Sequence, residues 1–151
     1  MARIHARKKG KASSKKPYVT ESPAWVPLSA EEIVEIVVPQ AKEGYSLSSI
    51  GTMLRDQYGV PDVKLAVGKS MLDICKENGV SPSIPEDLMN LMKKAVTLDS
   101  HIQSNKKDLH NMRSLHLTEE KIRRLSKYYV REGTLPSGWK YRRADAKLMV
   151  E

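Results

Sequence analysis

The chain contains no phenylalanine, a single cysteine and few aromatic residues, which make up 5% of its 151 residues. Hydrophobic residues make up 40%, so a core is possible, but it must be largely aliphatic. Cys75 alone cannot form an internal disulfide, which excludes a small disulfide-stabilised secreted scaffold. No apolar run approaches the roughly 18 residues of a membrane span, and no apolar stretch follows the basic first residues as in a signal peptide. We therefore expect a soluble intracellular protein without a membrane partner.

Negative charge is in deficit, and the positive excess is concentrated at the two ends of the sequence. The net charge is +8, from 26 Lys and Arg against 18 Asp and Glu. Residues 1–16 hold seven cations and no acid, residues 17–100 seven cations and twelve acids, and residues 101–151 twelve cations and six acids. This asymmetry favours a polyanionic partner contacted at both ends, although a solubilising tail explains residues 1–16 equally well. The candidate contacts in the first segment are Arg3, Arg7, Lys8, Lys9 and Lys11.

The N-terminal half is expected to contain an extended arm and a region of three short helices. Residues 1–28 lack apolar periodicity and contain several Gly, Pro and Ser residues, which predicts a basic extended arm. Residues 29–80 show apolar residues at helical spacing. The predicted helices start at Ser29, Ser46 and Pro61 and end at Gly44, Gly59 and Asn78. Pro39 should kink or open the first helix because it lacks a backbone N–H.

Two long amphipathic helices are predicted in residues 81–132. The first begins after a cap at Ser83 or Ile84, with Pro85 in its first turn, where proline is tolerated. A polar turn at residues 105–108 separates it from the second. Each helix has an apolar stripe that needs a partner, so we expect the two to pack as an antiparallel hairpin.

The fold class that follows is all-α, because no strand pattern is present. We expect a helical bundle with a long antiparallel hairpin, three short N-terminal helices and extended basic tails. Gly133, Pro136 and Gly138 end the second long helix, and residues 133–151 are interpreted as a basic C-terminal tail.

Catalytic and metal-binding motifs are not found, so we expect neither an enzyme nor a cofactor. The sequence contains no GxSxG, HExxH, P-loop or GxGxxG pattern. Cys75 lies on an apolar helical stripe and is interpreted as a small buried hydrophobe. His101, His110 and His116 are too widely spaced, without a second cysteine, for a typical zinc site.

Two groups of residues have a composition typical of nucleic-acid binding. Around the turn, cations that suit phosphates accompany side chains that can read base edges and 2′-hydroxyls, although composition alone modestly favours a solvated turn capped by an acid. The turn group comprises His101, Lys106, Lys107, Asp108, His110, Asn111 and Arg113. The second group interleaves eight cations with tyrosine and tryptophan rings, which favours phosphate contacts and base stacking. Its cations are Lys121, Arg123, Arg124, Lys127, Arg131, Lys140, Arg142 and Arg143, and its rings are Tyr128, Tyr129, Trp139 and Tyr141.

Two other functions fit parts of the sequence. The short helices could form a helix-turn-helix DNA-binding regulator using residues 46–77, but the segment 63–77 that would read DNA is barely basic. A helical module that binds an acidic protein is the other alternative. Binding to structured RNA, duplex DNA and an acidic protein, compared at one salt concentration, distinguishes the three.

Several motifs, in order, resemble the family of ribosomal small-subunit protein fifteen. The main signature is His101-Ile-Gln-Ser-Asn-Lys-Lys-Asp-Leu-His-Asn-Met-Arg-Ser-Leu, followed by Lys121-Ile-Arg-Arg-Leu-Ser-Lys-Tyr-Tyr. Four further segments resemble the longer archaeal and eukaryotic branch of this family: Met1-Ala-Arg-Ile-His-Ala, Ser48-Ser-Ile-Gly-Thr-Met-Leu-Arg-Asp, Pro85-Glu-Asp-Leu and Leu135-Pro-Ser-Gly-Trp-Lys-Tyr. The resemblance spans essentially the whole chain, and the archaeal form fits best.

The resemblance implies a structural component of the small ribosomal subunit in the cytoplasm, with ribosomal RNA and neighbouring ribosomal proteins as partners. In this family the protein binds the central domain of the small-subunit RNA, at a three-way junction and a nearby shallow groove, and stabilises its fold during assembly. The resemblance places His101, Asp108 and Asn111 in the groove, and Tyr128 and Arg131 at the junction. The bacterial branch has serine at the position of Asn111 and ends in a further helix, a pattern broken here by residues 136–139.

Overall fold

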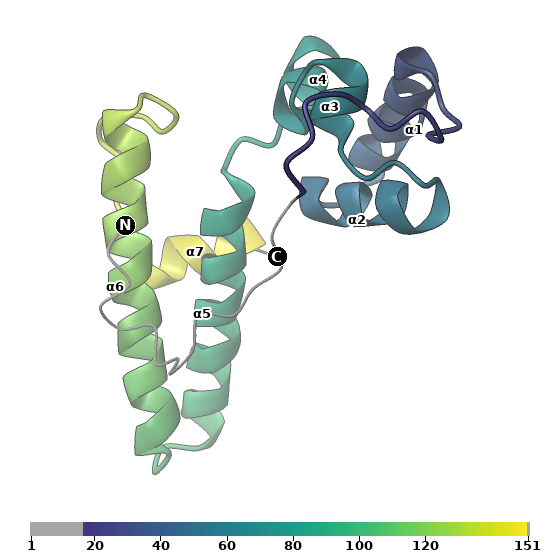
Figure 1. The fold of residues 1–151 in the computed structure, drawn as a ribbon. Helices are drawn as coiled ribbons and strands as arrows, with labels where there is room; N and C mark the ends of the chain where they lie inside the picture. Colours follow the sequence, from purple (N-terminus) through teal and green to yellow (C-terminus); the bar gives the residue numbers. More distant parts are fainter. Residues whose placement is uncertain (1–16, 151) are drawn as a thin grey trace.

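The computed structural model describes residues 17–150, which form seven α-helices and no strand. The all-α class is therefore confirmed for this part of the chain, and Figure 1 shows its path. The first basic segment, with Arg3, Arg7, Lys8, Lys9 and Lys11, lies outside the described residues. The helices are α1 (Ala30–Lys42), α2 (Leu47–Gln57), α3 (Val63–Val67), α4 (Met71–Glu77), α5 (Glu86–Ser104), α6 (Leu109–Arg131) and α7 (Arg143–Val150).

The N-terminal lobe, α1 to α4, surrounds one aliphatic core. Ile33 and Val37 of α1 are fully buried against Ile50 and Leu54 of α2 and Ile74 of α4. Burial of each such side chain is worth ~1.5–3 kcal/mol, which offsets the low intrinsic stability of short helices. The predicted buried role of the cysteine is also confirmed, since Cys75 has no exposed surface and burial raises the pKa of its thiol.

The predicted third helix is wrong in one respect, because the structure divides it into α3 and α4. Gly68 adopts a left-handed conformation, with φ +80°, and its N–H donates to the carbonyl of Lys64 at 3.0 Å to end α3. Ser70 then caps α4 by accepting the N–H of Asp73 at 3.2 Å. Both signals are present in the sequence, but the continuous apolar spacing masked them.

The structure tests the predicted N-caps of α1, α2 and α5 and the predicted effect of Pro39 on α1. Ser29 and Glu32 form the predicted capping box, and Ser46 caps α2. α1 continues through Pro39 to Lys42, so the proline does not end the helix. The predicted cap of α5 at Ser83 or Ile84 is wrong: Pro85 occupies the N-cap position and makes no side-chain capping bond.

α5 and α6 form the predicted antiparallel hairpin, and they lie side by side along most of their length (Figure 1). Leu88, Met92 and Ala95 of α5 are buried against Leu115 and Ile122 of α6. At the open end of the hairpin, the Tyr129 hydroxyl donates to both oxygens of Asp87 at 2.8 Å, which links the end of α6 to the start of α5. Burial and this contact raise the pKa of Tyr129 to about 12.

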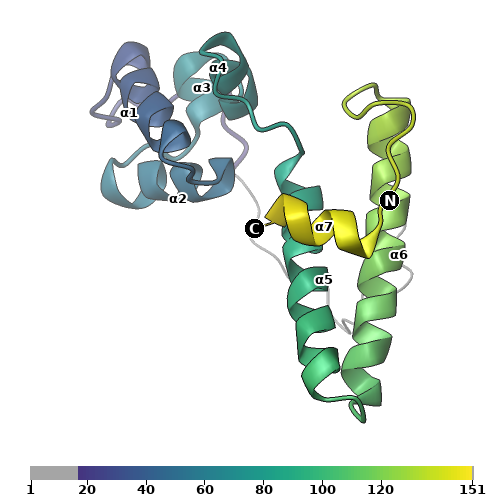
Figure 2. The ribbon, with the colours of Figure 1, turned by 180° about the vertical axis from the view of Figure 1, so that it is seen from behind.

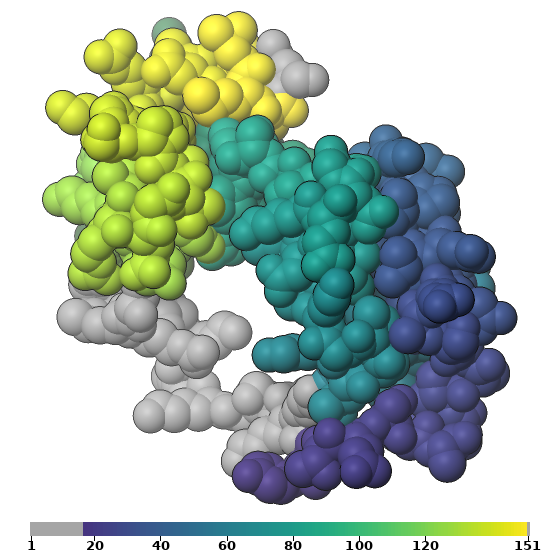
Figure 3. All heavy atoms as spheres, turned by 90° about the horizontal axis from the view of Figure 1, so that it is seen from above, coloured from purple at the N-terminus to yellow at the C-terminus, as the bar shows by residue number. Residues whose placement is uncertain are grey.

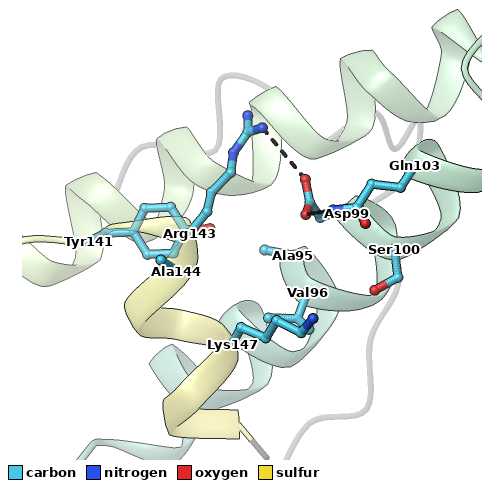
Figure 4. A pocket seen from close by; sticks show the side chains of 9 residues that line it. All are labelled: Ala95, Val96, Asp99, Ser100, Gln103, Tyr141, Arg143, Ala144 and Lys147. Carbon is cyan, nitrogen blue, oxygen red and sulfur yellow. Dashed lines mark hydrogen bonds and ion pairs between the residues drawn. The ribbon is translucent and has the colours of Figure 1, made fainter.

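The expectation of an extended C-terminal tail is wrong for residues 143–150, because they form α7. α7 packs against α5 with Ala146 buried, and Figure 2 shows it crossing the hairpin. Arg143 joins α7 to both long helices: its guanidinium donates to Glu119 of α6 at 2.5 and 3.0 Å and lies 3.6 Å from Asp99 of α5. The contact with Asp99 is drawn in Figure 4. A buried carboxylate is costly unless it is paired, and Arg143 supplies that pair for Glu119.

The N-terminal lobe and the hairpin are joined by a short linker and by polar contacts. The Glu86 carboxylate at the start of α5 accepts the backbone N–H of Ser48 at 3.1 Å and the Ser48 hydroxyl. Seen from above in Figure 3, the N-terminal lobe lies on one side, with the residues after α6 and α7 on the other. The motifs typical of RNA binding thus belong to a hairpin braced by α7, while the acidic N-terminal lobe packs around its own core.

Candidate nucleic-acid interface

The turn between α5 and α6 brings His101, Asp108 and Asn111 together, and we call these residues the turn triad. Nε2 of His101 lies 3.0 Å from Oδ2 of Asp108, and Nδ2 of Asn111 donates to the same oxygen at 2.7 Å. The three come from the end of α5, the N-cap of α6 and its first turn. Residues that the family resemblance assigns to one groove therefore form one hydrogen-bonded cluster.

Asp108 is also the N-cap of α6, because its Oδ1 accepts the backbone N–H of Asn111 at 2.9 Å. This contact, with those from His101 and the Asn111 side chain, holds the pKa of Asp108 well below its usual range. The carboxylate is therefore ionised at neutral pH. The capping role that the sequence left as an alternative is real, but it uses Oδ1, and the Asp108 side chain keeps 29% of its surface exposed.

Asn105 fixes the orientation of the histidine ring in this cluster. Its side-chain nitrogen lies 3.4 Å from Nδ1 of His101 and donates to the His101 carbonyl at 3.1 Å. The network is satisfied when Nε2 of His101 carries the proton and donates to Asp108, while Nδ1 accepts from Asn105. The turn triad is thus arranged before any ligand arrives, and the histidine side chain keeps 42% of its surface exposed.

The cations of the turn are exposed and available to a partner. Lys106 and Lys107 lie in the turn itself, and Arg113 follows in the first turns of α6. Within residues 17–150, none of the three makes an ion pair. An anionic triad flanked by free cations suits a ligand that offers hydrogen-bond donors between phosphates.

The second half of α6 presents Arg124, Tyr128 and Arg131 on one face, as their spacing predicts. The Tyr128 ring is 42% exposed, and the guanidinium carbon of Arg131 lies 5.8 Å from its centre. Tyr129 packs edge-on against Tyr128 at 5.2 Å. Seventeen residues separate Asn111 from Tyr128, so the two patches lie about 26 Å apart along the helix.

Two cations of the second predicted group form ion pairs with acidic side chains of the same chain. Arg143 pairs with Glu119 and Asp99, and Arg123 pairs with Glu120. Sequence reasoning missed these pairings because it counted charge without the helical register. It also missed that residues 133–142 fold back along α6, which brings Trp139 and Lys140 beside Lys127. The buried Leu135 and the helix-forming stretch 143–150 were the available signals.

The structure gives no support to the DNA-binding alternative or to a metal site. The segment 63–77 that would read DNA is broken into α3 and α4, and Lys69 is paired with Glu77 at 2.8 Å. Among residues 17–150, no three His, Cys, Asp or Glu side chains are grouped as a metal site requires. No helix in the same range is long and apolar enough to cross a membrane.

Comparisons with known proteins agree on one family. Residues 1–60 match the ribosomal S13/S15 N-terminal domain, and residues 72–149 match the ribosomal protein S15 model. Proteins called small ribosomal subunit protein uS15 are similar over nearly the whole chain: 50% identical in Methanoculleus marisnigri and 52% in Methanoregula boonei, each over 99% of both chains, and 48% in Methanococcus vannielii over 100% of both. This chain belongs to the ribosomal protein S15 family, in its archaeal form.

Proposed function

We propose that this chain, a structural and non-enzymatic protein of the small ribosomal subunit in the cytoplasm, binds the central domain of small-subunit ribosomal RNA. The turn triad enters the shallow groove of an RNA helix, and Arg124, Tyr128 and Arg131 contact a three-way junction. Docking of the rigid hairpin fixes the mutual orientation of the RNA helices and so stabilises the RNA fold during assembly.

The observation that carries this proposal is the turn triad itself. An ionised carboxylate at the tip of a basic hairpin opposes binding to a polyanion by charge alone, but it can accept hydrogen bonds from RNA. Asp108 accepts hydrogen bonds only, and RNA offers donors in its wide, shallow groove: the guanine amino group and the 2′-hydroxyls. His101 and Asn111 hold the carboxylate in place at 3.0 and 2.7 Å.

The spacing of the two patches supports a ligand with two rigid parts. The triad and Tyr128 lie about 26 Å apart on one helix, braced by α5 and α7. A single short duplex segment offers groove and phosphates, but a junction adds unstacked bases that an exposed tyrosine ring and Arg131 can contact. Lys106, Lys107 and Arg113 then neutralise phosphates next to the groove.

The N-terminal lobe is better suited to protein neighbours. Residues 17–80 carry nine acids and five cations, so their charge opposes contact with RNA phosphates. Trp25, Tyr45 and Tyr58 expose 67%, 56% and 37% of their surface in this lobe. Aromatic side chains on an acidic surface fit basic neighbouring ribosomal proteins.

Equilibrium binding to a central-domain RNA fragment, a duplex DNA and an acidic protein at one salt concentration tests the proposal. We expect the RNA fragment to bind tightest and a scrambled RNA of equal length to bind at least tenfold more weakly. Tyr128→Leu should weaken binding to the fragment, whereas Tyr45→Leu, which removes an even more exposed ring from the N-terminal lobe, should not. Equal affinity for duplex DNA and RNA would exclude the proposed function.

A further inference from the structure

The second half of α6 and the segment 133–142 form the two walls of an open groove of about 590 Å³, which we call the basic groove. One wall carries Arg124, Lys127 and Arg131 of α6, and the other carries Trp139 and Lys140. The turn triad and Tyr128 do not line it. Its size lies within the range that accommodates one nucleotide-sized ligand.

The wall formed by residues 133–142 is held at both ends, so the groove is present before a ligand binds. After α6, the N–H groups of Thr134 and Leu135 donate to the carbonyl of Tyr129 at 3.0 and 3.2 Å, and Leu135 is buried in the hairpin core. At the other end, Arg143 is anchored on Glu119 at 2.5 and 3.0 Å. Trp139 packs partly buried against the same core, which fixes its ring.

Charge in the basic groove strongly favours an anion. Five cations line it, against one acid, Glu120, and that acid is paired with Arg123. Within the described part of the chain, Lys127, Arg131 and Lys140 make no ion pair with an acid. A phosphate group placed between the walls would meet cations from both.

The ring of Trp139 distinguishes a nucleotide from a plain anion. Positive side chains that follow a backbone, with an aromatic ring on which a base stacks, are the recurring features of single-stranded nucleic-acid sites. A duplex keeps its bases stacked inside and could offer this groove phosphates only. An acidic peptide would use the cations but would gain little from the ring.

We propose that the basic groove binds one unstacked nucleotide of the ribosomal RNA, with its base on Trp139 and its phosphates on Lys127, Arg131 and Lys140. This inference rests on the proposed function for the identity of the partner. It adds a contact, made by residues 137–141, that is separate from the turn triad. It also gives the Glu119–Arg143 pair a positioning role, since that pair holds one end of the wall.

Tryptophan fluorescence gives a direct test, because the chain contains two tryptophans. Trp25→Phe leaves Trp139 as the single reporter. We expect hexaadenosine, a single-stranded RNA, to quench Trp139 with saturation, and a 12-base-pair RNA duplex at equal phosphate concentration to quench it much less. Equal quenching by the duplex, or by hexaglutamate, would overturn the proposal, since it would indicate a site that recognises charge alone.

Substitutions measured with the same probe locate the contact. By fluorescence anisotropy of labelled hexaadenosine, Trp139→Leu and Lys140→Gln should each reduce affinity by about five- to hundredfold. Lys121→Gln, which removes an exposed α6 cation outside the basic groove, should change it less than twofold. Melting temperatures close to that of the parent show that the variants are folded, and unchanged affinity of both folded groove variants would refute the inference.

Binding to the central-domain RNA fragment separates this inference from the proposed function. If Asp108→Asn weakens binding to the fragment while Trp139→Leu and Lys140→Gln do not, the proposed function stands and the basic groove does not hold an RNA nucleotide. If the two groove variants weaken it and Asp108→Asn does not, the groove is a contact and the triad is not. Weakening by all three supports both.

Discussion

Substitution of Asp108 separates the two roles that the structure gives this residue. Its Oδ1 caps α6 through the N–H of Asn111 at 2.9 Å, while Oδ2 accepts from His101 and the Asn111 side chain in a side chain that is 29% exposed. Asparagine is as good an N-cap as aspartate but has lost the charge and one acceptor oxygen. Alanine loses both the cap and the acceptors. Asp108→Asn therefore keeps the cap but removes an acceptor used by His101, by the Asn111 side chain and by any RNA donor, whereas Asp108→Ala removes the cap as well.

The expected magnitudes distinguish recognition from simple electrostatics. If Asp108 acts only through its charge, its removal should tighten binding to a polyanion. If it accepts hydrogen bonds from RNA, both variants should lose about five- to hundredfold in affinity for the central-domain fragment, by analogy with base-specific contacts in DNA complexes. Loss of the cap should lower the melting temperature of Asp108→Ala by about 2–4 °C, while Asp108→Asn stays near the parent.

Fluorescence anisotropy with the fragment and a scrambled RNA, together with thermal unfolding of the same samples, provides both readouts. Glu35→Ala removes an exposed acid of α1 with no partner role in the hairpin and serves as the control for charge. Unchanged or tighter RNA binding by both Asp108 variants, with only Asp108→Ala less stable, would refute the reasoning and leave Asp108 as a cap alone.

Three further predictions concern stability and salt. Burial raises the pKa of Glu119, but the hydrogen bonds and charge of Arg143, with the charge of Arg123, lower it by more, so the net pKa is lowered. Glu119→Ala should therefore cost about 2 kcal/mol of unfolding free energy at pH 7. A lowered pKa gives stability that is present above the ordinary value and lost in acid, so this cost should shrink as the pH falls below 4.5 in urea titrations. Gly68→Ala should destabilise by about 1–2 kcal/mol because φ is +80°, whereas Gly51→Ala, inside α2 with free space around it, should stabilise by about 0.5–1 kcal/mol in the same titrations. Deletion of residues 1–16 should reduce the slope of log affinity against log salt concentration by about 0.7–0.9 per lost phosphate contact. The preference for the cognate fragment should remain, and binding at several salt concentrations measures both.

The hairpin and its turn could be predicted from the sequence because the local helix and turn patterns agree with the packing that the apolar stripes require. Apolar stripes of four turns or more demand a partner, and the polar residues 105–108 permit only a tight reversal. The short elements were less predictable. A single apolar periodicity runs through Gly68, but a left-handed glycine followed by a serine cap divides it into two helices.

The C-terminal helix shows what sequence reasoning could not supply. The segment 143–150 has only eight residues, three of them charged, and an isolated helix of that length is unstable in water. α7 forms because Arg143 reaches a buried carboxylate on α6 and Ala146 packs against α5. Both contacts depend on the register of distant helices. The proximity of the turn residues could be predicted for the opposite reason, since they lie within ten positions across one turn, and the family resemblance singled out His101, Asp108 and Asn111.

The most direct test of the central claim is a double-mutant cycle between Asp108 and the RNA groove. Guanosines in the shallow groove of the fragment are replaced in turn by inosine, which lacks the amino group, and riboses by deoxyribose. We predict that at least one replacement weakens binding to the parent by about tenfold and leaves the affinity of Asp108→Asn unchanged, since the contact is already lost. If every replacement weakens parent and variant equally, Asp108 does not read the RNA, and the account of this hairpin as a groove-reading element is contradicted.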